Sequence, residues 1–217
     1  MIPIDYSLYL VTDAGLGRGR STHQIVEAAM RGGVTMVQYR EKTASTRRMI
    51  DEALDLRQLC RTYSVPFIIN DRLDVALAVD ADGLHVGQDD MPAGLARKLL
   101  GPGKLLGVSV ENARQARLAL DDGADYVGAS PIFATPTKPD APPAIGLQGL
   151  QELARNTSLP IVAIGGVNAS NAASVLRAGA GGLAVVSAIV SAEDVEQAAR
   201  ELKRIIQDTR RAYPAEV

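Results

Sequence analysis

Polar and charged side chains gather at the ends of short apolar runs in this sequence. After one such run come Gln38, Arg40 and Lys42, which alternate with two other residues. Because side chains alternate along a strand, Gln38 and Arg40 share a face that Lys42 continues. A guanidinium fork and a mobile ammonium group suit phosphate oxygens, so the motif indicates an anion site. The alternative is a solvated loop with an ion pair between Arg40 and Glu41.

Carboxylates follow the next two apolar runs. Asp71 comes after Asn70, and the other run is followed by Asp89 and Asp90. Such oxygen ligands suit Mg²⁺, which takes one or two carboxylates together with substrate phosphate and water. Each aspartate has an alternative role as the N-cap of the helix that follows it. A metal–pyrophosphate complex explains why basic and acidic groups occur together, because it gives both a partner.

The longest irregular stretch, residues 130–143, holds five of the 11 prolines. A loop of about 14 residues without structure of its own is uncommon and usually serves as a lid or binding segment. Thr135, Thr137 and Lys138 offer two hydroxyls and a cation to an anionic ligand. We therefore expect a lid-like loop here, the alternative being a variable solvent loop.

Eight short apolar runs must position these residues. The first begins at residue 8 and the last at residue 183, a spacing of about 25 residues that is typical of a βα repeat. The pattern predicts an α/β protein, a compact (β/α)8 barrel that spans residues 1–217 as one domain. The alternative is an open doubly wound sheet, which usually has fewer strands. The runs are residues 8–11, 36–37, 67–69, 84–86, 105–108, 126–128, 161–164 and 183–186.

The segments between the runs are expected to be helices. Ser21 or Thr22 suits the start of the first, and Ser191, followed by acidic residues, suits the start of the last. Three similar joints place Gly33, Gly123 and Gly179 just past a helix end, where a left-handed residue is favoured. Their repetition indicates a single architecture.

Backbone groups after the last two runs predict a second anion site. Gly165 and Gly166 follow the seventh run, and Ser187 follows the eighth. Barrels often bind phosphate with these two loops and the N-terminus of a short helix. Two anion sites fit two phosphorylated substrates joined with loss of pyrophosphate, but also an isomerase or an aldolase. His85, inside the fourth run, has either a hydrogen-bonding role in the core or a chemical one.

Composition removes several classes of protein. Lysine and arginine number 23 against 25 aspartates and glutamates, so a basic surface for nucleic acid is not expected. A single cysteine, Cys60, excludes a disulfide framework and a cysteine-based zinc site. No apolar run approaches the roughly 18–20 residues of a membrane span, and no export signal is visible. We expect a cytoplasmic protein that has no membrane partner and that can form a homodimer.

Together and in this order, the motifs resemble those of the thiamine-phosphate synthase family over nearly the whole chain. They are residues 9–13, 38–42, 70–71, 82–90, 107–109, 125–128, 135–138 and 164–167. The resemblance implies an alkyl transferase of thiamine biosynthesis. Its substrates would be hydroxymethylpyrimidine diphosphate and hydroxyethylthiazole phosphate, and its products thiamine phosphate and pyrophosphate. Pyrophosphate would leave first, and the thiazole nitrogen would capture a pyrimidine carbocation.

The resemblance also implies roles for single residues. Mg²⁺ would be held by Asp71 and Asp90, and the catalytic residues would be Arg40, Lys42, Ser109 and Lys138. The pyrimidine diphosphate would contact Gln38, Arg40, Lys42, Asn70, Ser109 and Lys138. The thiazole phosphate would contact Thr135, Thr137, Gly166, Val186 and Ser187. The same motifs add Tyr39, Glu41 and Pro136 to the substrate-binding set.

Two departures from the family pattern bear on the alternatives. Ser130 precedes Pro131 where many members have glycine, and Glu111 stands where many have histidine. The related thiazole tautomerases use a histidine at position 111 and generally lack both aspartate motifs, so the synthase is favoured. A third alternative is a catalytically silent barrel that binds a phosphate ligand and regulates a partner. The intact set of cations and carboxylates argues against it.

Overall fold

The apolar runs form eight short parallel strands in the computed structural model, which describes residues 4–135, 137 and 142–213. Each strand is three to six residues long, as befits strands that are covered on both faces. The strands are β1 (Leu8–Val11), β2 (Met36–Tyr39), β3 (Phe67–Asn70), β4 (Gly83–Val86), β5 (Leu105–Val110), β6 (Tyr126–Ala129), β7 (Ile161–Ala163) and β8 (Gly182–Val185).

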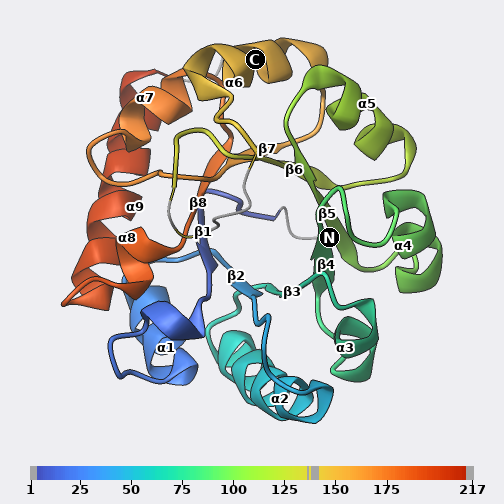
Figure 1. The fold of residues 1–217 in the computed structure, drawn as a ribbon. Helices are drawn as coiled ribbons and strands as arrows, with labels where there is room; N and C mark the ends of the chain where they lie inside the picture. The colour runs from blue at the N-terminus through green and yellow to red at the C-terminus, as the bar shows by residue number, and fades with distance from the viewer. Residues whose placement is uncertain (1–3, 136, 138–141, 214–217) are drawn as a thin grey trace.

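The sheet closes on itself. Every strand pairs in parallel with its neighbour in sequence, and β1 also pairs with β8, with Tyr9 opposite Ala184. Figure 1 looks into the resulting ring. An open doubly wound sheet would leave two edge strands unpaired, so the closure confirms the predicted (β/α)8 barrel.

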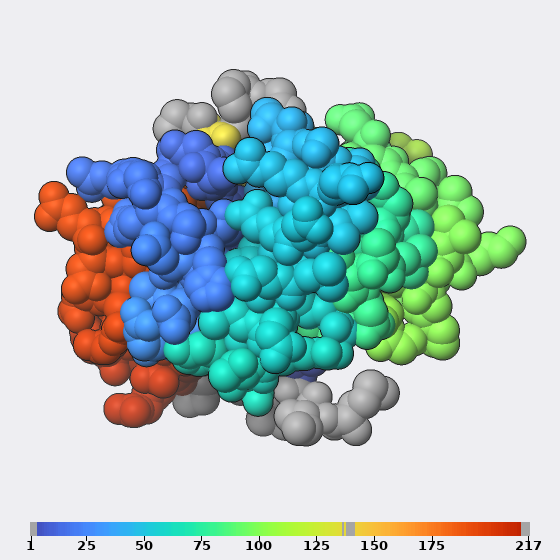
Figure 2. Space-filling view, turned by 90° about the horizontal axis from the view of Figure 1, so that it is seen from below, coloured from blue at the N-terminus to red at the C-terminus, as the bar shows by residue number. Residues whose placement is uncertain are grey.

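Helices cover the outside of the barrel (Figure 1). They are α1 (Thr22–Arg31), α2 (Thr46–Thr62), α3 (Leu73–Ala78), α4 (Ala93–Leu100), α5 (Ala113–Asp121), α6 (Gly146–Asn156), α7 (Ala172–Arg177), α8 (Ser187–Val190) and α9 (Val195–Ala212), with a 3-10 turn, η1, at Ala14–Leu16. The first helix packs against the last, which brings the blue and red segments of Figure 2 side by side. No helix in the described part of the chain is long and apolar enough to cross a membrane.

The N-caps of the first and last helices can be compared with the residues that the sequence predicts for them. Ser21 forms a capping box with Gln24 at the start of α1, as the sequence indicates. The expected start of the last helix was wrong. Asp194 is the N-cap of α9, and Ser191 ends the short helix α8. An extra helix therefore interrupts the segment between β8 and α9.

The core has two parts because side chains alternate along each strand. Leu8 and Leu10 face outward into the apolar layer beneath the helices. Tyr9 and Val11 face inward and pack with residues such as Tyr126 from across the barrel. The interior is not wholly apolar, since Gln38 and His85 are also buried.

Candidate functional site

A cavity of about 470 Å³ lies at the mouth of the barrel, where the strands end. Twelve of the residues expected to bind substrate or metal line it, which confirms that their spacing brings them together. They are Gln38, Arg40, Lys42, Asn70, Asp71, Asp90, Ser109, Thr135, Thr137, Gly166, Val186 and Ser187. Pro136 and Lys138 lie outside the described residues.

Tyr39 and Glu41 do not reach the cavity. The hydroxyl of Tyr39 donates to Glu52 in α2 at 2.8 Å. Glu41 accepts from the backbone N–H groups of Thr43 and Ala44, and although burial raises the pKa of Glu41, these hydrogen bonds hold it below its ordinary value. Strand alternation turns Tyr39 away from Gln38 and out of the barrel, whereas Glu41 lies beyond the end of β2 and its hydrogen bonds hold the turn that follows.

Arg40 enters the cavity already paired. Its guanidinium donates to Oδ2 of Asp13 at 3.2 Å, and both side chains are about four-fifths buried. The other oxygen of Asp13 accepts from the backbone of Gly15. The expected alternative, an ion pair with Glu41, is not formed. Asp13 follows the end of β1 by two residues and is the N-cap of η1, and its position just after a strand is the sequence signal that could have identified it.

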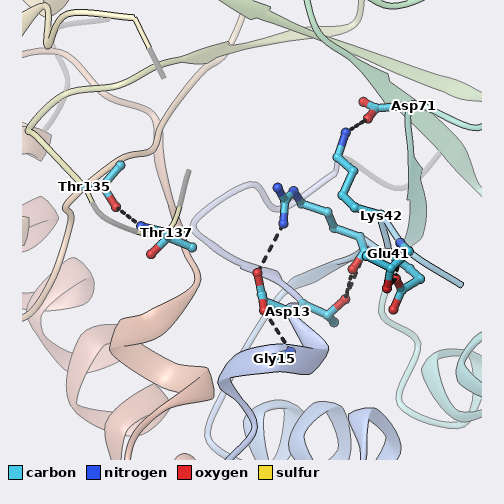
Figure 3. A network of polar contacts seen from close by, with 10 residues as sticks. Asp13, Gly15, Glu41, Lys42, Asp71, Thr135 and Thr137 are labelled. Atoms are coloured by element: carbon cyan, nitrogen blue, oxygen red, sulfur yellow. Dashed lines mark hydrogen bonds and ion pairs between the residues drawn. The ribbon is translucent and has the colours of Figure 1, made fainter. Parts of the chain in front are cut away.

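Asp71 has an unusual backbone conformation. Its φ is +59°, in the left-handed region that few residues other than glycine adopt. Its N–H donates to the carbonyl of His85 at 2.8 Å, which ties the end of β3 to β4. The side chain accepts from Nζ of Lys42 at 2.5 Å (Figure 3). No side-chain cap is present on α3, so the N-cap alternative for Asp71 fails.

Asp90 lies beside Asp71 and is the second carboxylate of the cavity. Oδ2 of Asp90 accepts from the N–H of Gly87 at 2.8 Å, and α4 begins without a side-chain cap. Burial, and then the neighbouring Asp71, raise the pKa of Asp90. Two carboxylates that repel each other in a half-buried place are a fitting pair for a divalent cation.

The donor set suits Mg²⁺ rather than zinc. Among the described residues there is no cluster of three or more histidine, cysteine, aspartate or glutamate side chains that could hold a metal. Zinc usually requires at least three such ligands, whereas Mg²⁺ binds through one or two carboxylates and keeps positions for phosphate oxygens and water. Asp71 and Asp90 meet the second requirement.

A chain of polar side chains crosses the floor of the cavity. Gln38 donates to the Tyr9 hydroxyl at 3.0 Å, which lies 2.9 Å from that of Tyr126. His85 follows, with Nδ1 3.0 Å from Tyr126 and Nε2 3.0 Å from Oγ of Ser109. Burial lowers the pKa of His85 to about 4, so the imidazole is neutral. His85 thus forms the hydrogen bonds that one of its two expected alternatives requires, and a chemical role stays untested.

The opposite wall of the cavity is made of backbone. Gly165 and Gly166 have φ values of +99° and +65°, which glycine alone adopts without strain. Their carbonyl oxygens are held from outside, by the N–H of Phe133 at 3.0 Å and by Nδ2 of Asn171 at 2.9 Å. Nearby, Ser187 begins the short helix α8, whose first N–H groups have no partner within the helix. Such a wall is suited to phosphate oxygens.

Comparisons with known proteins agree with this geometry. A family described as thiamine monophosphate synthase matches residues 8–189. The thiamine-phosphate synthase of Chloroflexus aurantiacus is 63% identical over 206 residues, 95% of both chains. That of Syntrophomonas wolfei is 52% identical over 205 residues, 94% of this chain and 98% of the other. The solved thiamine phosphate pyrophosphorylase from Pyrococcus furiosus superposes with a TM-score of 0.88 at 42% identity, covering 95% of this chain and 98% of that one.

Proposed function

The chain belongs to the thiamine monophosphate synthase family, and from that premise we propose how the cavity at the barrel mouth carries out the reaction. The activity is that of a thiamine-phosphate synthase, a transferase that joins hydroxymethylpyrimidine diphosphate to hydroxyethylthiazole phosphate. The observation that carries the assignment of the site is the meeting of cations, two carboxylates and a glycine wall around one cavity.

The pyrimidine diphosphate binds on the side of β2, β3 and β5. Gln38, Asn70 and Ser109 contact it together with the cations Arg40, Lys42 and Lys138, the last of which lies outside the described residues. The fixed guanidinium of Arg40 and the mobile ammonium of Lys42 neutralise the diphosphate, which carries the charge that grows as it leaves.

Asp71 and Asp90 would hold Mg²⁺, the metal that the family generally uses. When bound, Mg²⁺ supplies positive charge to the diphosphate oxygens. The fit rests on the two half-buried carboxylates and on their place beside Lys42.

The bond between the pyrimidine methylene carbon and the diphosphate oxygen breaks first, and its electron pair leaves with pyrophosphate. The carbocation that remains is stabilised by the pyrimidine ring, and the thiazole nitrogen lone pair then forms the new C–N bond. No side chain has to act as a nucleophile. The protein must instead neutralise the leaving group, orient the two substrates and exclude water.

The thiazole phosphate binds opposite, where it contacts Gly166, Val186 and Ser187 together with Thr135 and Thr137. Pro136, which the family motif adds to this set, lies outside the described residues. The segment 130–143 serves as the lid that excludes water, although residues 136 and 138–141 lie outside the described part. Two small substrates are thus the partners of this site. The expected homodimer and the cytoplasmic location stay predictions.

The proposal is tested by pyrophosphate release. The purified protein, given both substrates and Mg²⁺, should release one pyrophosphate for each thiamine phosphate formed, and chelation with EDTA should stop both. Omitting the thiazole phosphate is the control for simple hydrolysis of the diphosphate. Product formation that continues unchanged in EDTA would exclude the metal site, and absence of product with both substrates would exclude the synthase site.

A further inference from the structure

The polar chain beneath the cavity links two residues of the pyrimidine site that lie on different strands. It runs from Gln38 on β2 to Ser109 on β5, through three side chains that the reaction described above does not use. Those three, Tyr9, Tyr126 and His85, come from β1, β6 and β4, and each is at most 8% exposed. A connection of this length inside a barrel needs a reason, because buried polar groups are costly unless all are satisfied.

The chain has a direction, which its first link sets. Either tyrosine hydroxyl could donate in the link between Tyr9 and Tyr126. The Gln38 amide nitrogen donates to the hydroxyl of Tyr9, and Tyr126 is the one acceptor within reach of the Tyr9 proton among the described residues, so the direction that satisfies both groups has Tyr9 donating to Tyr126. Tyr126 in turn gives its single proton to Nδ1 of His85. The imidazole is then protonated on Nε2, and Nε2 donates to Oγ of Ser109.

Two glycines make room for this arrangement. A Cβ at Gly107 would collide with the ring and hydroxyl of Tyr126 and with Nδ1 of His85. A Cβ at Gly128 would lie 3.1 Å from Cε1 of His85. Gly107 and Gly128 are the only glycines of β5 and β6, and both lie against these rings. The strands therefore have no side chain at the two positions where one would prevent His85 and Tyr126 from forming their hydrogen bond.

We propose that Tyr9, Tyr126 and His85 are positioning residues that present the hydroxyl of Ser109 as a donor to the bound pyrimidine diphosphate. Because Ser109 accepts from His85, its own proton is left for an acceptor atom in the cavity, and no hydrogen bond among the described residues takes it. The ligand atom is therefore a phosphate oxygen or a ring nitrogen with a free lone pair. This inference rests on the proposed placement of that substrate beside Ser109.

The direction of the chain is tested without substrate, by ¹⁵N NMR of the protein labelled in its histidine rings. The chain has only two histidines, so the variant His23→Gln identifies the signals of His85. The proposal expects a neutral ring with Nε2 protonated and Nδ1 bare. A ring protonated on Nδ1 would reverse the chain, make Ser109 the donor to His85 and overturn the proposal.

Kinetics test the effect on Ser109. Ser109→Ala and Tyr126→Phe should each lower kcat/KM about tenfold, the worth of one hydrogen bond in a buried site, and the double variant should fall little further. Tyr6→Phe is the matched control, because the ring of Tyr6 packs 5.1 Å from that of Tyr126 and its hydroxyl is not part of the chain. This control should keep full activity.

The outcomes separate this inference from the proposed function. Reduced activity of Ser109→Ala together with full activity of Tyr126→Phe would overturn the positioning role alone. Full activity of Ser109→Ala would overturn it together with the assignment of Ser109 to the pyrimidine site. Losses that simply multiply in the double variant would show that Tyr126 acts independently of Ser109, which also contradicts the proposal.

Discussion

The ammonium group of Lys42 lies 2.5 Å from Oδ2 of Asp71, the carboxylate that we assign to the metal (Figure 3). The lysine side chain is half exposed, whereas that of Asp71 is largely buried. Asp71 therefore has a cationic partner before any metal arrives. We therefore expect Mg²⁺ to compete with Lys42 for this oxygen until a diphosphate offers the lysine other oxygens.

Removing the competitor should affect metal binding and turnover in opposite directions. In Lys42→Met without substrate, Mn²⁺ used as a spectroscopic substitute for Mg²⁺ should bind about two- to fivefold more tightly, the worth of a partly exposed ion pair. Turnover should fall, because the leaving pyrophosphate loses a cation. Electron paramagnetic resonance of free Mn²⁺ measures the first effect. Lys104→Met, which breaks a lysine–aspartate pair away from the cavity, is the control, and weaker Mn²⁺ binding in Lys42→Met would contradict the competition.

Loss of either metal carboxylate should be partly repaired by excess metal. Asp71→Ala and Asp90→Ala should each weaken Mg²⁺ binding by about 10–100-fold or more, so turnover at ordinary Mg²⁺ falls and rises again at high Mg²⁺. Steady-state rates over a Mg²⁺ titration measure this. Asp89→Ala, the exposed neighbour, should follow the wild-type curve. Wild-type curves for both cavity variants would remove the metal assignment.

The ionised carboxylate of Asp90 should lower the free energy of unfolding of the metal-free protein at neutral pH. Burial and the nearby Asp71 raise the pKa of Asp90, so the folded protein binds a proton at a pH where the unfolded chain has lost it. The ionised carboxylate then destabilises the fold at neutral pH, and this penalty fades as the pH falls through the raised pKa. Asp90→Asn in EDTA should raise the free energy of unfolding at pH 7 and give a smaller gain at acid pH. Urea unfolding at both pH values measures it, and a gain that does not shrink in acid would contradict it.

The barrel and most of the cavity follow from the sequence because both depend on local order along the chain. Residues at the ends of parallel strands must meet at one edge, which is how Asp71 and Asp90 could be paired. Strand alternation also predicts that Tyr39 faces away from the cavity. Tyr39 was assigned to the substrate-binding set only because it belongs to the same family motif as Gln38. The partners across the barrel could not be predicted. Tyr9 meets Tyr126 from 117 residues away, and such contacts depend on how the closed sheet places its inward side chains.

The glycine wall should tolerate no side chain. In Gly166→Ala the methyl group would meet a positive φ and would also lie 2.8 Å from Cβ of Phe133. Gly19→Ala is the matched control, since Gly19 has φ +82° with nothing within 4 Å of the added carbon, and it should lose only about 1–2 kcal/mol for the backbone. Gly166→Ala should lose more stability and should raise KM for the thiazole phosphate. Thermal unfolding and steady-state kinetics measure the two effects, and equal stability losses would show that Phe133 yields without cost.

Asp13 should act on the reaction only through Arg40. In Asp13→Asn, the remaining side-chain oxygen still accepts from Gly15, but the new amide group faces Arg40 with a donor instead of a charge. The guanidinium then loses its anchor, so KM for the pyrimidine diphosphate should rise about two- to tenfold, as expected for one charge-assisted hydrogen bond.

The double variant decides whether this path is right. Once Arg40→Ala has removed the guanidinium, Asp13→Asn should have little further effect, because the two residues act as one unit. Steady-state kinetics of the four proteins give the coupling between them. If Asp13→Asn were as harmful without Arg40 as with it, the aspartate would act on the substrate or the fold by itself. In that case the hydrogen bond between Asp13 and Arg40 at 3.2 Å would not be what positions the guanidinium for the substrate.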